Sequence, residues 1–507
     1  MKKLLAFLLI LALTLICAVS CTKPNPEGEE TTPDTENGEN NENGGNADDG
    51  NTDGGNTDGG EGTAKLESSA GLKFSLNSSK ENYSLVGIGT CTDKNIVVDT
   101  YENLPVTAIS PNAFYESTAI ESITIGDSVK GINYSAFEGC TTLKSVKIGK
   151  NVTFIGSDAF WGCKELTDVE INGNALTRIE ERAFMECRKL KNINIPSSVT
   201  TFGTNCFDAC YNINFNVYGN AKYIGNENDK YIYLFKATSD DVTEVTIHNT
   251  TRIIGSTAFY GSKLKSVTIP ASVETIDEHA FYGSTALTDV TIENGVKNIL
   301  ASAFHDCSSL KNITLPKSIE NIGSQAFSGC NSVNGEVYDG AKYIASTDNP
   351  YFYLYGAISK DITKATVHKD TIYIGSYAFE ECTKLTEVSI PEGVKHIMSS
   401  AFHSCKSLTT INIPSTVISL GSTLFVSCES LESIYIPDGI ENLESYLFSG
   451  CTSLKSVSIP SSVKYIMSGA FKECHDDLVI EFRGTEDEWA NVYKSSSFDS
   501  VVTFKKD

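Results

Sequence analysis

Positive charge is scarce in this chain of 507 residues, in which 40 lysines and arginines stand against 64 acidic residues, a formal net charge of −24. The imbalance is strongest near the N-terminus, where residues 22–64 contain twelve acidic residues and a single base, Lys23. Proteins that bind phosphate backbones need basic patches, and neither this segment nor the rest of the acidic chain is suited to such a partner. We therefore expect no nucleic-acid partner.

Histidine is also sparse, with seven residues in the whole chain. The cysteines and histidines form no CxxC or HxxxH cluster, so the usual spacing of a metal site is missing. No histidine pairs with a recurrent carboxylate or serine in a catalytic motif, although His248 and His368 occupy equivalent positions in a duplicated segment. No stretch is long and non-repetitive enough for a separate catalytic domain. We expect no catalytic residue, no metal, no cofactor and no enzyme activity.

The N-terminal apolar run is too short to span a bilayer comfortably, because residues 4–16 supply about 13 residues where a transmembrane helix needs about 20. With two lysines before it and small residues after it, the run predicts an export signal peptide at residues 1–20. The Ala-Val-Ser-Cys junction at residues 18–21 resembles a bacterial lipoprotein box, which implies lipidation of Cys21. It departs from the common pattern, which has Leu where Ala18 stands. Ordinary signal cleavage at the same place, which releases a soluble protein, is the alternative.

Large apolar side chains are almost absent from residues 21–65, which are rich in Asn, Gly, Asp, Glu, Thr and Pro. Such a segment cannot offset its ordering entropy, so we predict a disordered acidic tether behind the lipidated cysteine. As a Gly-rich coil it reaches roughly 35 to 40 Å. We therefore expect an exported, membrane-anchored lipoprotein at the cell surface that touches the membrane only through its lipid. A secreted or periplasm-facing protein is the alternative.

The rest of the chain is dominated by a repeat, marked by a phenylalanine that usually follows alanine. The intervals are 22 to 24 residues, with two intervals of 52. The markers are Phe114, Phe137, Phe160, Phe184, Phe207, Phe259, Phe281, Phe304, Phe327, Phe379, Phe402, Phe425, Phe448 and Phe471. A period in the twenties is typical of a solenoid, whose repeats bury their apolar sides only by stacking. We predict a β-rich solenoid of about 14 coils of roughly 23 residues, with parallel strands and little helix.

Within each copy, a Val-x-Ile alternation predicts a short parallel strand with its apolar side chains inward, and a Val-x-x-Ile segment predicts a second inward-facing side. The copy at residues 454–474, LKSVSIPSSVKYIMSGAFKEC, closely resembles the leucine-rich repeats of BspA-like bacterial surface proteins. The resemblance extends over residues 66–507. It implies adhesion, with host extracellular-matrix or plasma proteins, or other bacteria, as partners.

The ends of the repeat array depart from the period. A solenoid end exposes an unpaired core and needs an atypical cap. We therefore place an N-terminal β cap at residues 66–110, the solenoid at residues 111–474 and a C-terminal cap at residues 475–507.

The cysteines form a series of their own, because eleven of them stand three residues after a repeat phenylalanine. They are Cys140, Cys163, Cys187, Cys210, Cys307, Cys330, Cys382, Cys405, Cys428, Cys451 and Cys474. Side chains in register on stacked coils lie about 4.8 Å apart, whereas the two Cβ atoms of a disulfide lie about 3.8 Å apart. Serine replaces cysteine in other copies, which fits a small buried donor to the backbone. We predict mostly free, buried thiols and assign no role to Cys91 or Cys206.

The two long intervals mark inserts near residues 211–240 and 331–360, and the second insert repeats the first at an offset of 120 residues. The shared tyrosines are Tyr218, Tyr223, Tyr231 and Tyr233 in the first insert and Tyr338, Tyr343, Tyr351 and Tyr353 in the second. Each insert is predicted to be a β-hairpin with a polar loop. The rings either pack the hairpin onto the solenoid or form a ligand platform, since tyrosine is favoured at binding hot spots.

The outward position of each predicted strand is a second candidate surface, and threonine is frequent there. Four of these positions are Thr246, Thr268, Thr291 and Thr314. Solenoids present such ladders as recognition faces, although threonine is also simply a good strand residue. Together with the eight tyrosines, these threonines form our candidate ligand surface.

The combined features favour a cell-surface binding or adhesion protein that presents an extended repeat face to protein or glycan ligands. A structural or scaffold lipoprotein of the bacterial cell envelope is the alternative. Carbohydrate capture by the tyrosine-rich hairpins is a third hypothesis.

Overall fold

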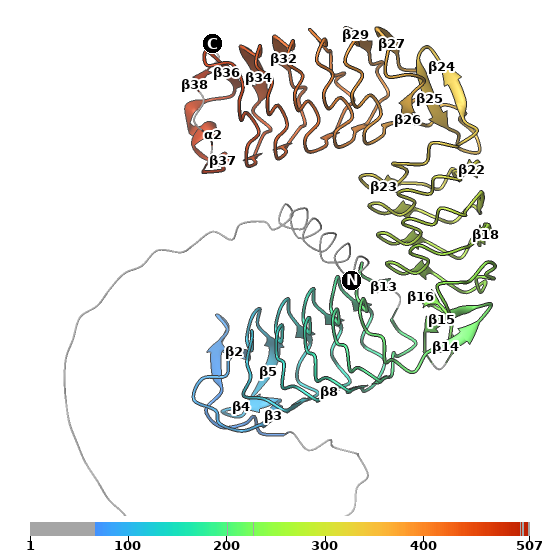
Figure 1. Ribbon diagram of the computed structural model, residues 1–507. Helices are drawn as coiled ribbons and strands as arrows, with labels where there is room; N and C mark the ends of the chain where they lie inside the picture. Colours follow the sequence, from blue (N-terminus) through green and yellow to red (C-terminus); the bar gives the residue numbers. More distant parts are fainter. Residues whose placement is uncertain (1–65, 200, 227, 497, 499–500, 505–507) are drawn as a thin grey trace, which may run out of the picture. The chain divides into compact units, whose positions relative to one another are not determined.

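The computed structural model describes residues 66–199, 201–226, 228–496, 498 and 501–504. The predictions for residues 1–65, lipidation of Cys21 included, lie outside these residues. The unit Lys65–Asp507 is a β-solenoid of about 18 turns with almost no helix (Figure 1). The predicted fold class is confirmed, whereas the predicted number of about 14 coils is too low.

One side of the coils carries the predicted Val-x-Ile strands, which pair in parallel with equivalent strands of neighbouring coils and form four separate sheets. These strands are β3 (Asn95–Val98), β6 (Ser122–Ile125), β8 (Ser145–Ile148), β10 (Asp168–Ile171), β12 (Asn192–Ile193), β18 (Ser266–Ile269), β20 (Asp289–Ile292), β22 (Asn312–Thr314), β27 (Lys364–Thr366), β29 (Glu387–Ser389), β32 (Ser433–Tyr435), β34 (Ser456–Pro460), β36 (Val479–Arg483) and β38 (Val501–Phe504). In β8 the side chains of Val146 and Ile148 are buried and that of Lys147 is exposed, as the alternation predicts.

A second side is built from shorter parallel strands, most of them two residues long. They are β2 (Tyr83–Gly87), β5 (Leu104–Ile109), β7 (Gly131–Ile132), β9 (Phe154–Ile155), β11 (Arg178–Ile179), β13 (Thr201–Phe202), β17 (Ile253–Ile254), β19 (Thr275–Ile276), β21 (Asn298–Ile299), β23 (Asn321–Ile322), β28 (Tyr373–Ile374), β30 (His396–Ile397), β31 (Ser419–Leu420), β33 (Asn442–Leu443), β35 (Tyr465–Ile466) and β37 (Tyr493–Lys494). At the N-terminal end, β1 (Lys73–Leu76) pairs antiparallel with β2, and β4 (Thr100–Tyr101) with β5.

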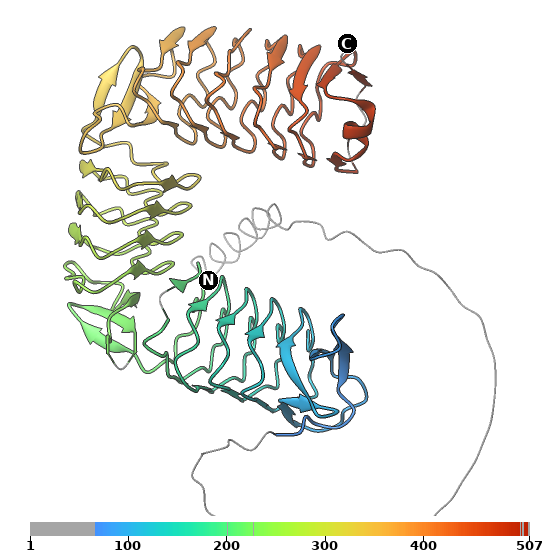
Figure 2. The ribbon, with the colours of Figure 1, turned by 180° about the vertical axis from the view of Figure 1, so that it is seen from behind.

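Each insert is a three-stranded antiparallel meander, so the predicted hairpins are confirmed and one strand more is present. The first contains β14 (Asn216–Tyr218), β15 (Ala221–Ile224) and β16 (Tyr233–Ala237), and the second contains β24 (Glu336–Tyr338), β25 (Ala341–Ile344) and β26 (Tyr353–Ala357). The broad arrows of both meanders are visible from behind in Figure 2. The extra strands form because Gly219-Asn220 and Asp339-Gly340, all with positive φ, make two-residue turns.

The additional turns of the solenoid come from these irregular segments. Strand β16 pairs in parallel with β17, and β26 pairs in parallel with β28, so each insert continues the stack. At the ends, β2 and β5 continue it in one direction, and β36 and β38 continue it in the other. The repeat phenylalanine, which we used as the marker, is absent from these turns, so the sequence count missed them.

The core of each block of repeats contains a ladder of stacked phenylalanine rings. We call the repeats marked by Phe114 to Phe207 block 1, those marked by Phe259 to Phe327 block 2, and those marked by Phe379 to Phe471 block 3. Neighbouring ring centroids lie 5.0–5.7 Å apart in block 1, 5.0–5.5 Å in block 2 and 5.4–5.6 Å in block 3. Each ring thus has its neighbour in the next coil as its packing partner.

The cysteine series lies beside this ladder, and all thirteen described cysteines are free. Ten thiols of the series donate to the carbonyl oxygen of the phenylalanine one coil earlier, at 3.0–3.2 Å. Where serine replaces cysteine, the Ser284 hydroxyl makes the same bond to the Phe259 oxygen at 2.7 Å. The prediction of free, buried thiols that donate to the backbone is confirmed for the described residues.

The C-terminal end is covered by the short helix α2 (Glu486–Ala490), whose first turn has a capping box formed by Thr485 and Glu488. The Trp489 ring on this helix packs against Phe482 of β36, with the ring centroids 5.0 Å apart. The helix therefore shields the apolar end of the stack from water. No helix that the described residues form is long and apolar enough to cross a membrane.

The inserts also join the blocks. The Tyr233 ring meets Phe207, the last ring of block 1, edge-on at 5.8 Å. The two blocks also contact each other directly. The Asn205 backbone N–H of block 1 donates to the Asp277 carboxylate of block 2 at 3.1 Å. Asp277 is 1% exposed, and burial raises its pKa to about 7, helped by the charges of Glu278 and Asp208 and opposed by two backbone N–H donors.

We expect the described cysteines to resist alkylation in the folded protein and to react fully in denaturant without reductant. Burial raises the pKa of the Cys382 thiol to about 11 and that of the half-buried Cys474 to about 12, so thiolate is scarce at neutral pH. Mass spectrometry after iodoacetamide treatment measures both states. A set of cysteines that reacts in denaturant only after reduction contradicts the absence of disulfides.

The buried Asp277 should make stability fall as pH rises. The folded-state pKa of Asp277 lies above the ordinary value of 3.8. Its contribution to the free energy of unfolding is therefore most favourable below about pH 4 and declines until about pH 7. The full difference amounts to about 4 kcal/mol at most. Replacing Asp277→Asn should flatten this slope in guanidinium unfolding series between pH 4 and 8.

The junction between block 2 and block 3 supplies the matched control. There Met398 follows Ile397, as Asp277 follows Ile276 at the junction between block 1 and block 2. The variant Met398→Asp should add a pH-dependent loss of stability of the same sign. An unchanged slope in Asp277→Asn shows that this carboxyl titrates normally.

Candidate functional site

Four of the eight candidate tyrosines are buried and form no part of an exposed ligand surface. Tyr223, Tyr233, Tyr343 and Tyr353 are each at most 2% exposed. A Cβ on Gly255 would lie 2.6 Å from the Tyr233 hydroxyl, and Gly375 stands in the same relation to Tyr353, so both rings fill space that glycine leaves. The burial of these four rings fits the packing interpretation and leaves them no exposed area for a ligand.

Two of the buried tyrosines hold the backbone of a histidine. The Tyr223 hydroxyl accepts a hydrogen bond from the His248 backbone N–H at 3.4 Å, and the Tyr343 hydroxyl accepts one from the His368 backbone N–H at 3.1 Å. Burial raises the pKa of Tyr223 to about 12 and raises that of Tyr343 in the same direction. Both hydroxyls therefore stay protonated at neutral pH and fix the position of the histidine.

The remaining tyrosines of the first insert gather around His248. The Tyr231 ring lies over the imidazole with centroids 4.3 Å apart, and the Tyr218 ring stands nearly perpendicular to it at 4.8 Å. The two tyrosine rings are 5.5 Å apart. Tyr218 is 39% exposed, while Tyr231 and His248 are half-buried. We call these three residues cluster 1.

The second insert builds the same arrangement from Tyr338, Tyr351 and His368, which we call cluster 2. Tyr351 stacks on the imidazole at 3.7 Å, and Tyr338 stands perpendicular to it at 4.8 Å. Tyr338 is 39% exposed, as its counterpart in cluster 1 is. Two copies with the same ring order indicate that the arrangement follows from the duplicated sequence.

The polar frame of the clusters is also duplicated. The Tyr231 backbone N–H donates to the Asp229 carboxylate at 3.0 Å, and the Tyr351 N–H donates to the Asn349 side-chain oxygen at 2.9 Å. Positions 229 and 349 differ by the same 120 residues, and both side chains supply an acceptor oxygen. The loop of each insert thus sets the backbone that carries the stacked tyrosine.

The Nδ1 atoms of both histidines have polar partners, and for His248 these include the Thr250 hydroxyl oxygen at 2.9 Å, a contact in which donor and acceptor depend on the tautomer. Nδ1 of His248 accepts from the Thr250 backbone N–H, and Nδ1 of His368 accepts from the Asp370 backbone N–H, both at 3.3 Å. Within the described residues, neither Nε2 makes a hydrogen bond, so each Nε2 is available to a ligand as a donor or an acceptor, according to the tautomer.

The two histidines were not among the predicted site residues. They share the 120-residue offset of the tyrosines, and this was the signal that could have found them. The sequence offers them no catalytic partner, and their partners in the structure are aromatic rings.

The candidate threonines behave differently from the tyrosines. Thr268 on β18, Thr291 on β20 and Thr314 on β22 are exposed and lie in register on adjacent parallel strands. A second column, Ser266, Asp289 and Asn312, runs beside them, and the Asn312 amide donates to the Asp289 carboxylate at 2.6 Å. We call these two columns the block 2 ladder.

Thr246 is exposed but lies outside the named strands. Its backbone N–H donates to the Gly219 oxygen at 3.0 Å, which places it against the turn of the first insert. Gly219 has a φ of +53°, and a Cβ there would lie 2.1 Å from the Thr246 oxygen, so only glycine fits this turn. The structure thus brings Thr268, Thr291 and Thr314 together and sets Thr246 beside the insert.

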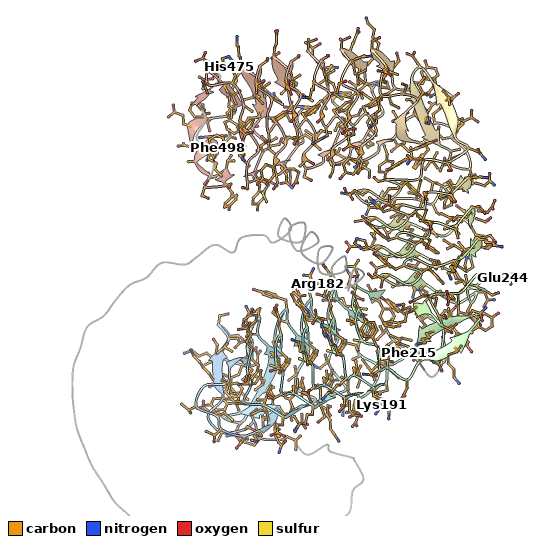
Figure 3. The ribbon with its side chains drawn as sticks, viewed as in Figure 1. Arg182, Lys191, Phe215, Glu244, His475 and Phe498 are labelled. Carbon is orange, nitrogen blue, oxygen red and sulfur yellow. The ribbon has the colours of Figure 1, made fainter. Side chains whose placement is uncertain are left out.

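The equivalent strands of block 1 have a different surface, because Lys147 and Glu170 occupy the outward positions and form an ion pair at 3.4 Å. The side chains of Arg182 and Lys191 mark the turn side and the strand side of the block 1 coils (Figure 3). An uncharged ladder of threonines is therefore a feature of block 2 and not of every coil.

No group of three or more His, Cys, Asp or Glu side chains in the described part of the chain is arranged to hold a metal ion. The clusters and the ladder contain rings, hydroxyls, amides, imidazoles and the Asp289 carboxylate, which suit binding through contact and hydrogen bonds.

A family comparison matches most of the chain. The BspA type leucine rich repeat region, a family described by six repeat copies, matches residues 107–228, 230–347 and 351–476. The chain belongs to this BspA-type family. The gaps between the three matches fall in the polar loops of the two inserts, where the repeat is interrupted.

Solved structures of similar proteins include a leucine-rich cell surface protein from Faecalibacterium prausnitzii, with 24% identity over 85% of this chain and 97% of that chain and a TM-score of 0.32. A leucine-rich repeat protein from Bacteroides ovatus has 22% identity over 86% and 98% of the two chains and a TM-score of 0.31. The pneumococcal vaccine antigen PcpA has 17% identity over 87% and 99% and a TM-score of 0.28. No curated protein matches the chain.

BspA-type leucine-rich-repeat proteins are usually surface proteins involved in binding. Their family and fold are typical of non-enzymatic binding proteins.

Proposed function

We propose that this BspA-type chain is a cell-surface adhesion protein that presents an extended repeat face to ligands. The partners we expect are host extracellular-matrix or plasma proteins, other bacteria, or glycans. The carrying observation is the block 2 ladder, in which Thr268, Thr291 and Thr314 are exposed and in register on three adjacent strands.

The geometry of this ladder supports a binding role. Parallel strands in adjacent coils repeat the same hydroxyl at intervals of about 4.8 Å, which suits an elongated partner that makes the same contact several times. The uncharged threonines avoid the desolvation cost that an ion pair such as Lys147–Glu170 would add to association. The buried core beneath each strand keeps the ladder fixed before a partner arrives, which lowers the entropy cost of binding.

We expect the triple variant T268R/T291R/T314R to bind its strongest partner at least tenfold more weakly than the natural protein. Three long charged side chains would cover the ladder and add a desolvation cost to any apposed surface. A tenfold loss corresponds to about 1.4 kcal/mol. Biolayer interferometry against a panel of matrix and plasma proteins measures the change.

The triple variant T285R/S308R/N331R is the matched control. These exposed residues belong to the same three coils but follow the buried Ser284, Cys307 and Cys330, away from the strands. Both triple variants change the net charge equally. If both triple variants lose the same binding affinity, the effect comes from charge alone. The block 2 ladder is then not the binding surface.

We also propose that Cys21 carries the lipid that anchors the protein. The variant Cys21→Ser should lose labelling by a radioactive fatty acid and leave the membrane fraction, because thioether attachment needs the thiol. Cys17→Ser, within the predicted signal peptide, should keep both properties. A membrane-bound and labelled Cys21→Ser protein contradicts lipidation at this site.

Protease treatment of intact cells separates surface display from the alternative of an envelope scaffold lipoprotein. A surface adhesin is cleaved on intact cells. If the chain survives until the outer layer is broken, it faces the interior of the envelope and adhesion is ruled out.

A further inference from the structure

We propose that cluster 1 and cluster 2 are two matched binding sites for neutral glycans, an inference that rests on the proposed surface-binding function and assigns it a ligand class. Each site would be formed by an exposed tyrosine, a tyrosine stacked on an imidazole, and the Nε2 atom of that imidazole. No residue of the block 2 ladder belongs to either site.

The rings of the clusters offer the apolar part of such a site. Pyranose rings present C–H groups on their faces, and these groups pack on aromatic side chains. Tyr218 and Tyr338 are each 39% exposed, and they stand perpendicular to the imidazoles. Tyrosine loses little side-chain entropy on binding, so an exposed tyrosine held by its neighbours makes a favourable contact.

The polar groups of the clusters remain available to a ligand. The hydroxyls of Tyr218, Tyr231, Tyr338 and Tyr351 make no hydrogen bond to other described residues, and the same is true of each histidine Nε2. In contrast, the buried Tyr223 and its counterpart have their hydroxyls bonded to backbone. Sugar hydroxyls both donate and accept, so they match a set of phenols and an imidazole nitrogen.

The charge of the chain argues for neutral over acidic glycans. The formal net charge is −24, which repels sulfated or carboxylated polymers. Neither cluster contains a lysine or an arginine, and the loop residue of cluster 1 that holds Tyr231 is the acidic Asp229. A phosphate or sulfate group would therefore find no counter-charge within either cluster.

A peptide strand is the alternative occupant of this surface. Strands β14 and β24 lie at the edges of their sheets, where an added strand could pair. Each is three residues long, so it offers few main-chain hydrogen bonds. The duplicated features are the rings and the imidazoles, and these favour a sugar over an extended peptide.

The duplication predicts two sites per chain. Isothermal titration of the full-length protein with cellohexaose, mannohexaose and chitohexaose should therefore give a stoichiometry of two for at least one of these neutral hexasaccharides. The variant Tyr218→Ala should reduce the stoichiometry to one, and Tyr218→Ala/Tyr338→Ala should abolish binding. Tyr218→Phe/Tyr338→Phe keeps both rings and should retain binding within about tenfold, a change of 1.4 kcal/mol.

Two controls make the result decisive. Tyr134 is 49% exposed and lies outside both clusters, so Tyr134→Ala should leave binding unchanged. The substituted tyrosines are exposed, and circular dichroism should therefore show an unaltered fold in each variant. Heparin is the anionic comparison and should not bind.

The proposal is overturned if no hexasaccharide binds saturably, if the double alanine variant binds like the natural protein, or if only heparin binds. Binding of a peptide library in place of the sugars assigns the clusters to the β14 and β24 edges and also overturns it. Retained binding of matrix or plasma proteins through the block 2 ladder would separate failure of this inference from failure of the adhesion proposal.

Discussion

Each coil of this solenoid depends on the next coil to bury its apolar side. A coil of about 23 residues has two or three short strands and one large ring, which is too little to form a core alone. The phenylalanine of one coil stacks on that of the next at 5.0–5.7 Å, and the neighbouring cysteine or serine donates to the backbone of the coil before it. The outward residues are free to vary because the core positions alone carry this requirement.

The inserts satisfy the same requirement with different residues. Where the phenylalanine ladder of block 1 ends, Tyr233 takes the next position in the core, and Tyr353 does the same after block 2. The meander of each insert therefore stays attached through buried tyrosines, while its other tyrosines remain at the surface. Each short insert therefore combines buried tyrosines that hold it to the core with tyrosines that lie at the surface.

The two candidate surfaces arise from different parts of this architecture. The block 2 ladder belongs to the repeat itself and extends along the strands, which suits an elongated partner. The clusters belong to the insertions and are local, which suits a small ligand unit. A surface protein with both kinds of surface could hold a protein partner and a glycan at separate places on one chain.

The sequence by itself determined the repeat, the class of fold and the state of the cysteines. These follow from a strict period, because a side chain that recurs once per coil must meet its own copies in the stack. The 120-residue duplication was likewise visible in the tyrosines. The number of turns was not, because segments such as β16 and β36 join the ladder without the marker phenylalanine.

Only the tertiary structure decided which tyrosines reach the solvent. Tyr231 and Tyr233 are two residues apart, yet one is half-buried in cluster 1 and the other lies in the core. The difference depends on Gly255, in the next coil, where the missing Cβ leaves room for the Tyr233 ring. His248 joined the site for the same reason, since a buried hydroxyl 25 residues earlier in the chain holds its backbone. Contacts between coils cannot be read from the local pattern, and they decide which tyrosines pack in the core and which lie at the surface.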